Sequence, residues 1–97
     1  ILEIIEQKKG FLNPHLTLAS VASQTDYGRT YVSKVFKQEF GGFYNYINRL
    51  RLDYAARYAQ EHPEANQDEI ARHSGFNSRV SQWRAAERLA KNEESNI

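Results

Sequence analysis

The apolar and polar positions along the chain follow the pattern of a helical protein. Apolar residues recur three and four positions apart, and no segment alternates for long enough to predict a strand. The longest helical pattern covers residues 43–61, with apolar side chains at Tyr46, Ile47, Leu50, Tyr54 and Tyr58. A helix of roughly 18 residues is about 27 Å long at ~1.5 Å per residue. We therefore expect an all-α fold built around one long helix.

Shorter helical patterns lie on either side of this segment, separated by residues typical of turns and caps. They predict helices over about residues 1–9, 18–24, 29–40, 67–74 and 79–91. An N-cap is expected at Thr17, Gly28 and Asn66, and a helix end at Gly41-Gly42. Residues 93–97 are polar, and we expect this tail to be frayed.

Two segments about 50 residues apart resemble each other. VASQTDYGRTYVSKVFK (residues 21–37) aligns with IARHSGFNSRVSQWRAAE (residues 70–87) if the second copy has one extra residue in its turn. Each copy predicts a short helix, a turn of three to four residues and a second helix with a basic residue partway along it. This is the helix-turn-helix layout, in which the second helix enters the major groove of DNA.

The apolar residues of the two copies predict how each helix pair packs. Ala22 and Ala71 leave room for the helices to approach closely. The aromatic residues in the turns, Tyr27 and Phe76, are expected to fill the gap between the helices. In the second helix of the first copy, the expected buried side comprises Tyr31, Val32, Val35 and Phe36.

Charge is nearly balanced over the 97 residues, at +1, but it is unevenly distributed. Residues 29–51 carry five basic residues and one acidic residue (+5 − 1 = +4), and residues 72–91 have the same balance. Acidic residues gather between these segments and at both ends. This distribution predicts two surfaces that face anions, with solvated helix faces as the simpler alternative.

Composition argues against several other classes of protein. There is no cysteine, which excludes disulfides and thiolate metal sites, and no apolar run approaches the ~18 residues of a membrane-spanning helix. The three histidines (His15, His62 and His73) have no metal-ligand spacing. The stretch EFGGF lacks the lysine and serine of a phosphate-binding loop. We therefore expect no enzyme activity, cofactor or metal.

The stretches VASQTDYGRTYVSKVFKQEFG, FYNYINRLRLDYA and DEIARHSGFNS follow one another along the chain. In this order they resemble the DNA-binding domain of AraC/XylS-type bacterial transcription activators, over about residues 16–78 and more loosely to residue 89. The resemblance implies two helix-turn-helix lobes, each a homeodomain-like three-helix unit, joined by a long linker helix. In this chain the lobes correspond to residues 1–42 and 63–92, and the linker helix to residues 43–62.

The resemblance also implies DNA contacts in the first copy. The groove-facing positions of the family fall on Thr30, Ser33 and Lys34. Lys34 is expected to donate to guanine, and the other two to contact a base edge or a thymine methyl group. Arg29 and Lys37 flank these positions and are assigned to phosphates.

Two arginines on the linker helix have different expected roles. Arg51 matches a near-standard arginine of the family, and we interpret it as structural, tying the linker to the first lobe. Arg49 is expected to touch a phosphate. The aromatic stripe on the same helix is interpreted as core, with Tyr46, Ile47 and Tyr54 as its members.

The second copy departs from the family pattern, because Gln82 and Ala86 replace large apolar residues and Glu87 replaces a lysine. One interpretation keeps the orientation of the last helix, with a DNA-facing set of Arg79, Val80, Trp83 and Arg84. The other turns the helix so that Trp83 is buried in the vacant volume and Arg84 moves toward the DNA backbone. We favour a second lobe that binds phosphates and recognises little sequence.

The expected function is sequence-specific binding of double-stranded DNA by the C-terminal output domain of a bacterial transcription regulator, an activator. The chain begins at Ile1 within an amphipathic segment, so we interpret it as a fragment whose sensor domain precedes it. RNA polymerase is a further expected partner, and the expected location is the cytoplasm, with a possible membrane tether in the missing part. The alternative is a helical module for dimerisation or protein interaction.

Overall fold

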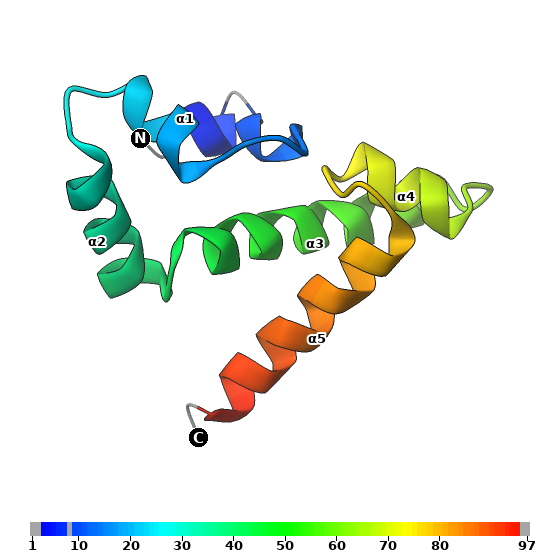
Figure 1. The fold of residues 1–97 in the computed structure, drawn as a ribbon. Coiled ribbons are helices and arrows are strands. Elements are labelled where there is room, and N and C mark those ends of the chain that lie inside the picture. The colour runs from blue at the N-terminus through cyan, green and yellow to red at the C-terminus, as the bar shows by residue number, and fades with distance from the viewer. Residues whose placement is uncertain (1–2, 8, 96–97) are drawn as a thin grey trace.

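The computed structural model describes residues 3–7 and 9–95. In this part of the chain, a short π-helix, η1 (Glu3–Gln7), and a 3-10 turn, η2 (Gly10–Leu12), precede the α-helices. These are α1 (Leu18–Ser23), α2 (Arg29–Phe40), α3 (Phe43–Glu61), α4 (Gln67–His73) and α5 (Arg79–Ser95). The long helix α3 runs through the middle, with α1 and α2 toward one end and α4 and α5 toward the other (Figure 1). The predicted all-α fold is confirmed.

Both ends of the chain differ from the prediction. The expected N-terminal helix is a single π-helical turn, Glu3–Gln7; Lys9 is not helical, and residues 1–2 and 8 of that prediction lie outside the described part. At the other end, α5 continues to Ser95, so residues 93–95 of the expected frayed tail are helical, whereas 96–97 lie outside the described part. Residues 92–95 contain neither glycine nor proline, so no backbone feature ends the helix there.

Local capping sets the helix boundaries as expected. Thr17 and Ser20 form a capping box, in which each backbone N–H donates to the hydroxyl of the other residue at 3.1 Å. The Asn66 side-chain oxygen accepts a hydrogen bond from the Glu69 backbone N–H at 2.9 Å. Gly41 ends α2 in the left-handed region, at φ 74°.

The main hydrophobic core lies between η1, η2, α1, α2 and the first half of α3. Its buried side chains are Ile5, Phe11, Leu16, Val21, Ala22, Val32, Phe36, Phe43 and Ile47. The Phe36 and Phe43 rings meet edge to face, with 5.2 Å between their centroids. This core holds α2 against α1 and α3, and so determines which face of α2 remains exposed.

Tyr46 and Tyr54 border this core, so the interpretation of the aromatic stripe as packing is confirmed. The Tyr46 ring lies 4.5 Å from the Phe40 ring, and its hydroxyl is buried without a hydrogen-bond partner among the described residues. Burial raises the pKa of Tyr46, and the Glu6 carboxylate raises this pKa further, although the two groups do not reach hydrogen-bonding geometry. The folded domain therefore favours the neutral phenol.

Arg51, buried on α3, joins the linker helix to residues 11–17, which precede α1 and are called the N-terminal connector. Its Nε donates to the Phe11 carbonyl oxygen at 2.7 Å and its Nη2 to the Asn13 carbonyl oxygen at 2.8 Å. The guanidinium also lies over the Phe76 ring of the second lobe, 5.9 Å from its centroid. Burial lowers the pKa of Arg51. The expected structural role of Arg51 is confirmed, and the residue contacts both lobes.

The second lobe has a much thinner core, in which Leu52 of α3 packs against Ala71, Phe76 and Ala85. Its turn approaches the N-terminal connector at Gly75, whose backbone is in the left-handed region at φ 94°. A Cβ at Gly75 would lie 2.5 Å from the Phe11 carbonyl oxygen. Only glycine allows this approach without displacing backbone.

Candidate nucleic-acid interface

Both copies of the repeat form a short helix, a turn and a longer second helix. Both turns have five residues, 24–28 and 74–78, rather than the expected three or four, because α1 ends at Ser23 and α4 at His73. α4, with 7 residues, is one residue longer than α1, with 6. Ala22 and Ala71 are both buried, as expected from their small size.

The predicted DNA contacts of the first copy lie on the exposed surface of α2. All five residues are exposed: Arg29, Thr30, Ser33, Lys34 and Lys37. At about 100° per residue, Lys34 lies directly opposite the buried pair Val32 and Phe36. None of the five side chains makes a hydrogen bond or an ion pair within residues 3–7 and 9–95. Their polar groups are therefore available to an external partner.

Two aromatic predictions in the first copy are wrong. Tyr27 and Tyr31, expected in the interior, are 55% and 53% exposed, and their rings stack with 4.9 Å between centroids. Phe11 and Phe36 already fill the interior of this lobe, and exposure leaves the two tyrosine hydroxyls in solvent. In the second copy the corresponding prediction is confirmed, since Phe76 is buried.

α5 buries a different stripe of residues from α2. Gln82 and Ala86 stand where α2 buries its two core residues, yet the side chains that α5 buries are Ala85 and Leu89. Ala86 is exposed, and Gln82 is half-buried with no partner for its side-chain oxygen in the described part of the chain. The helix is therefore turned about its axis relative to α2.

Trp83 lies on the outer side of α5, at 62% exposure, next to the exposed Val80. α5 is rotated about its axis in the direction opposite to the rotation that would bury Trp83. The interpretation in which Trp83 fills the vacant volume is therefore wrong. Leu89 and Ala85 face the interior instead, where Phe76 supplies most of the apolar volume. Val80 and Trp83 surround an open hollow together with Arg79 and with Gln67 of α4.

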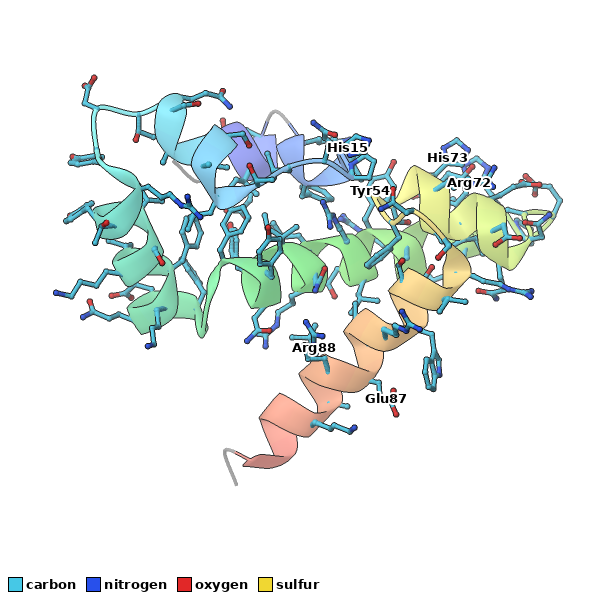
Figure 2. The ribbon with its side chains drawn as sticks, viewed as in Figure 1. His15, Tyr54, Arg72, His73, Glu87 and Arg88 are labelled. Carbon is cyan, nitrogen blue, oxygen red and sulfur yellow. The ribbon has the colours of Figure 1, made fainter. Side chains whose placement is uncertain are left out.

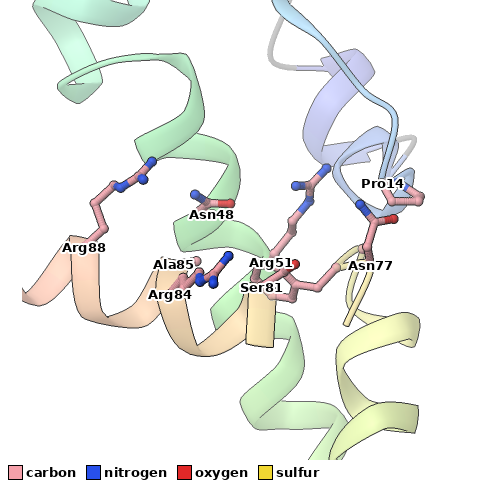
Figure 3. Close-up of a pocket in the computed structure, with 10 residues that line it drawn as sticks. Pro14, Asn48, Arg51, Asn77, Ser81, Arg84, Ala85 and Arg88 are labelled. Carbon is pink, nitrogen blue, oxygen red and sulfur yellow. The ribbon is translucent and has the colours of Figure 1, made fainter. Parts of the chain in front are cut away.

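Arg84 lies on a different flank of α5 from Trp83. With Arg88 it lines an open pocket of about 240 Å³ between α5, α3 and the N-terminal connector (Figure 3). Asn48 of α3 and Asn77 of the second turn also line this pocket. Arg88, Asn48 and Asn77 were not predicted from the sequence. The spacing of four residues between Arg84 and Arg88 does indicate that these two lie on the same side of a helix.

Arg49 is exposed on α3, on the side that borders α5. It lines a groove with Leu52 and Asp53, against Ala86 of α5. The structure therefore associates Arg49 with the second lobe, whereas the sequence left its lobe undefined.

Two of the three histidines, His62 and His73, pack against the same aromatic ring. The Tyr58 ring lies 4.2 Å from the His62 ring and 4.7 Å from the His73 ring. Among the described residues, no group of three or more His, Cys, Asp and Glu side chains is placed to hold a metal ion. None of the helices in that part is long and apolar enough to cross a membrane.

The fold is similar to that of a solved bacterial domain. The C-terminal domain of the two-component response regulator yesN from Fusobacterium nucleatum subsp. nucleatum matches with a TM-score of 0.71 and 23% sequence identity. The match covers 90% of this chain and 92% of that chain. No protein-family model matches the sequence, and a search of curated proteins finds no match. The likeness establishes that this chain has the fold of that response-regulator domain.

Proposed function

We propose that this domain binds double-stranded DNA sequence-specifically, as the output domain of a bacterial transcription regulator of the AraC/XylS type. One observation carries the proposal: two helix-turn-helix units share one long helix, and each exposes cationic side chains on its second helix, of which Lys34 on α2 and Arg79 and Arg84 on α5 form no ion pair with another described residue. The fold likeness to a response-regulator C-terminal domain supports it. Paired second helices of this kind bind successive major-groove segments, ~34 Å apart along one face of DNA.

The first lobe recognises bases through α2. Lys34, at the centre of the exposed face, donates to guanine O6 and N7. Thr30 and Ser33 contact a base edge or a thymine methyl group beside it. Arg29 and Lys37 bind phosphates, which position the helix without recognising sequence.

The second lobe holds the DNA mainly through its backbone. Arg79 begins the exposed face of α5, and Val80 and Trp83 offer an apolar contact to sugars or to a thymine methyl group. Arg84 and Arg49 bind phosphates. Since apolar contacts to sugars are the same for every base pair, this lobe contributes more to affinity than to sequence preference.

The regulator would place this domain next to a sensor domain, in the cytoplasm, where RNA polymerase is the partner of a DNA-bound activator. These partners rest on the AraC/XylS resemblance. They are tested by whether the full-length regulator stimulates transcription from a selected site in a reaction with purified polymerase.

The direct test is selection of bound sequences from a random duplex pool by the 97-residue chain. Two enriched blocks about ten base pairs apart would mean that both lobes recognise bases. One block would mean that α5 holds the backbone only, as proposed. Absence of enrichment, together with an affinity that does not change between low and physiological salt, would contradict DNA binding, because phosphate contacts release counterions.

A second candidate function is protein interaction, and the exposed Trp83 and Val80 favour it. Trp is enriched at the centres of protein interfaces, where it fills a pocket of the partner. Sedimentation equilibrium of the chain and of a Trp83→Ala variant separates the two functions. Self-association that this variant abolishes, without any binding to DNA, would favour the interaction module.

A further inference from the structure

The pocket between α5, α3 and the N-terminal connector is strongly positively charged. It is lined by three arginines, Arg51, Arg84 and Arg88, and by no acidic side chain. Figure 3 shows Arg84 and Arg88 on one flank of α5, facing Asn48 of α3. We refer to this site as the arginine pocket.

The positive charges of the arginine pocket are not neutralised within the described residues. Arg51 donates hydrogen bonds to two backbone carbonyl oxygens, which carry no net charge. Neither Arg84 nor Arg88 forms an ion pair or hydrogen bond with another described residue. The neighbouring Glu87 projects away from α3, whereas Arg88 extends toward it (Figure 2). Like charges so close together are unfavourable unless an anion lies between them.

Neutral donors complete the site. Asn48 and Asn77 line the pocket from α3 and from the second turn, and their side-chain amides have no partner among the described residues. The pocket is open and measures about 240 Å³, below the ~300–1,000 Å³ typical of sites for larger organic ligands. Its size and its convergent guanidinium groups suit a small polyatomic anion, which arginine binds through parallel hydrogen bonds.

We propose that the arginine pocket binds a single phosphate group through Arg84 and Arg88, with Asn48 and Asn77 donating from the opposite walls. Phosphate has oxygens on every side, so it accepts from α3, from α5 and from the turn at the same time. The phosphate comes either from the DNA backbone or from a free phosphorylated molecule. The first source rests on the proposed DNA binding, whereas the second is independent of it.

The test is an NMR titration of the 97-residue chain with inorganic phosphate at constant ionic strength, with chloride as the competing anion and without DNA. The Arg84 and Arg88 Nε–Hε resonances and the Asn48 side-chain amide should shift together and saturate. Arg88→Ala should weaken phosphate binding by about tenfold, as expected for loss of charge-assisted hydrogen bonds. Because Arg88 is exposed and alanine favours helix, this variant should keep the circular-dichroism spectrum of the parent chain.

Arg72→Ala is the matched control, because Arg72 is an exposed arginine on α4 and does not line the pocket. It removes the same charge and should leave phosphate binding unchanged. Shifts that do not saturate, or equal weakening by both variants, would overturn the proposal in favour of diffuse electrostatic attraction.

A second measurement identifies the source of the phosphate. If DNA supplies it, Arg88→Ala should reduce the slope of log affinity against log salt by about one, and Arg72→Ala should not. If a free phosphorylated molecule supplies it, both variants should keep the parent slope for DNA while only Arg88→Ala loses phosphate binding. Both results support a phosphate site, and saturable phosphate binding by a chain that does not bind DNA would refute only the proposed function.

Discussion

Replacing Arg51 by methionine tests whether one buried side chain holds the two lobes together. The substitution removes hydrogen bonds to the carbonyl oxygens of Phe11 (2.7 Å) and Asn13 (2.8 Å). A hydrogen bond from a charged donor contributes ~1.5–3 kcal/mol, so the two contribute roughly 3–6 kcal/mol. The methionine variant no longer has the desolvation cost of burying a charged guanidinium, and this offsets part of the loss. We expect the free energy of unfolding to fall by about 3 kcal/mol, a large share of the ~5–15 kcal/mol of a typical domain.

The assay is urea unfolding at neutral pH, followed by far-UV circular dichroism and fitted for midpoint and slope. Arg57→Met is the matched control, since it removes the same charge from an exposed position on the same helix. Arg51→Lys should fall between the parent and Arg51→Met, because an ammonium lacks the fork that reaches two separated carbonyls. A difference of less than ~0.5 kcal/mol between Arg51→Met and Arg57→Met would refute this account of the buried arginine.

Three further predictions concern backbone, pH and DNA. Gly75→Ala should lower the free energy of unfolding by about 3 kcal/mol, because residue 75 has φ 94° and the added Cβ would lie 2.5 Å from the Phe11 carbonyl oxygen. In the same urea assay, Gly28→Ala should lower it by less than ~1 kcal/mol, because no atom lies within 4 Å of a Cβ at that position. Above pH ~10 the unfolded chain loses the Tyr46 proton while the folded domain keeps it, so stability should fall with rising pH. Tyr46→Phe should reduce that fall, and an unchanged pH profile of the urea midpoint would contradict it. Lys34→Ala should reduce the discrimination between base pairs at one position of the selected site by ~1–3 kcal/mol of binding free energy. Lys37→Ala should weaken binding to all sequences equally, and binding assays on single-base variants of the site distinguish the two results.

Much of the fold was predictable because its causes are local. The Thr17 cap and the break at Gly41 depend on hydrogen bonds and backbone angles within a few residues. The exposed face of α2 also followed from its periodicity, with Lys34 opposite the buried side. The structural role of Arg51 was expected from the family resemblance and not from a local cause, and its contact with Phe76 of the second lobe was not predicted.

The errors arose where two elements compete for the same volume. Tyr27 and Phe76 occupy equivalent positions in the repeat, yet only Phe76 is buried. The first lobe receives Phe11 from a segment outside the repeat, and this ring contributes interior volume that the repeat pattern does not show. The residue that packs into the second-lobe core from outside the repeat is the smaller, partly buried Leu52 of α3, so the turn aromatic Phe76 is needed to fill that core.

The sequence by itself determined that this chain is helical, that it contains two similar helix pairs on one long helix, and which residues cap the starts of α1, α2 and α4. Periodicity and capping are properties of neighbouring residues, so they can be recognised without the fold. The tertiary structure decided how α5 is rotated about its axis, that Trp83 lies outside, and that Arg88 and Asn48 line the same pocket. The rotation of a helix about its axis depends on the volume that distant side chains such as Leu52 supply, and that volume exists only after the elements have packed.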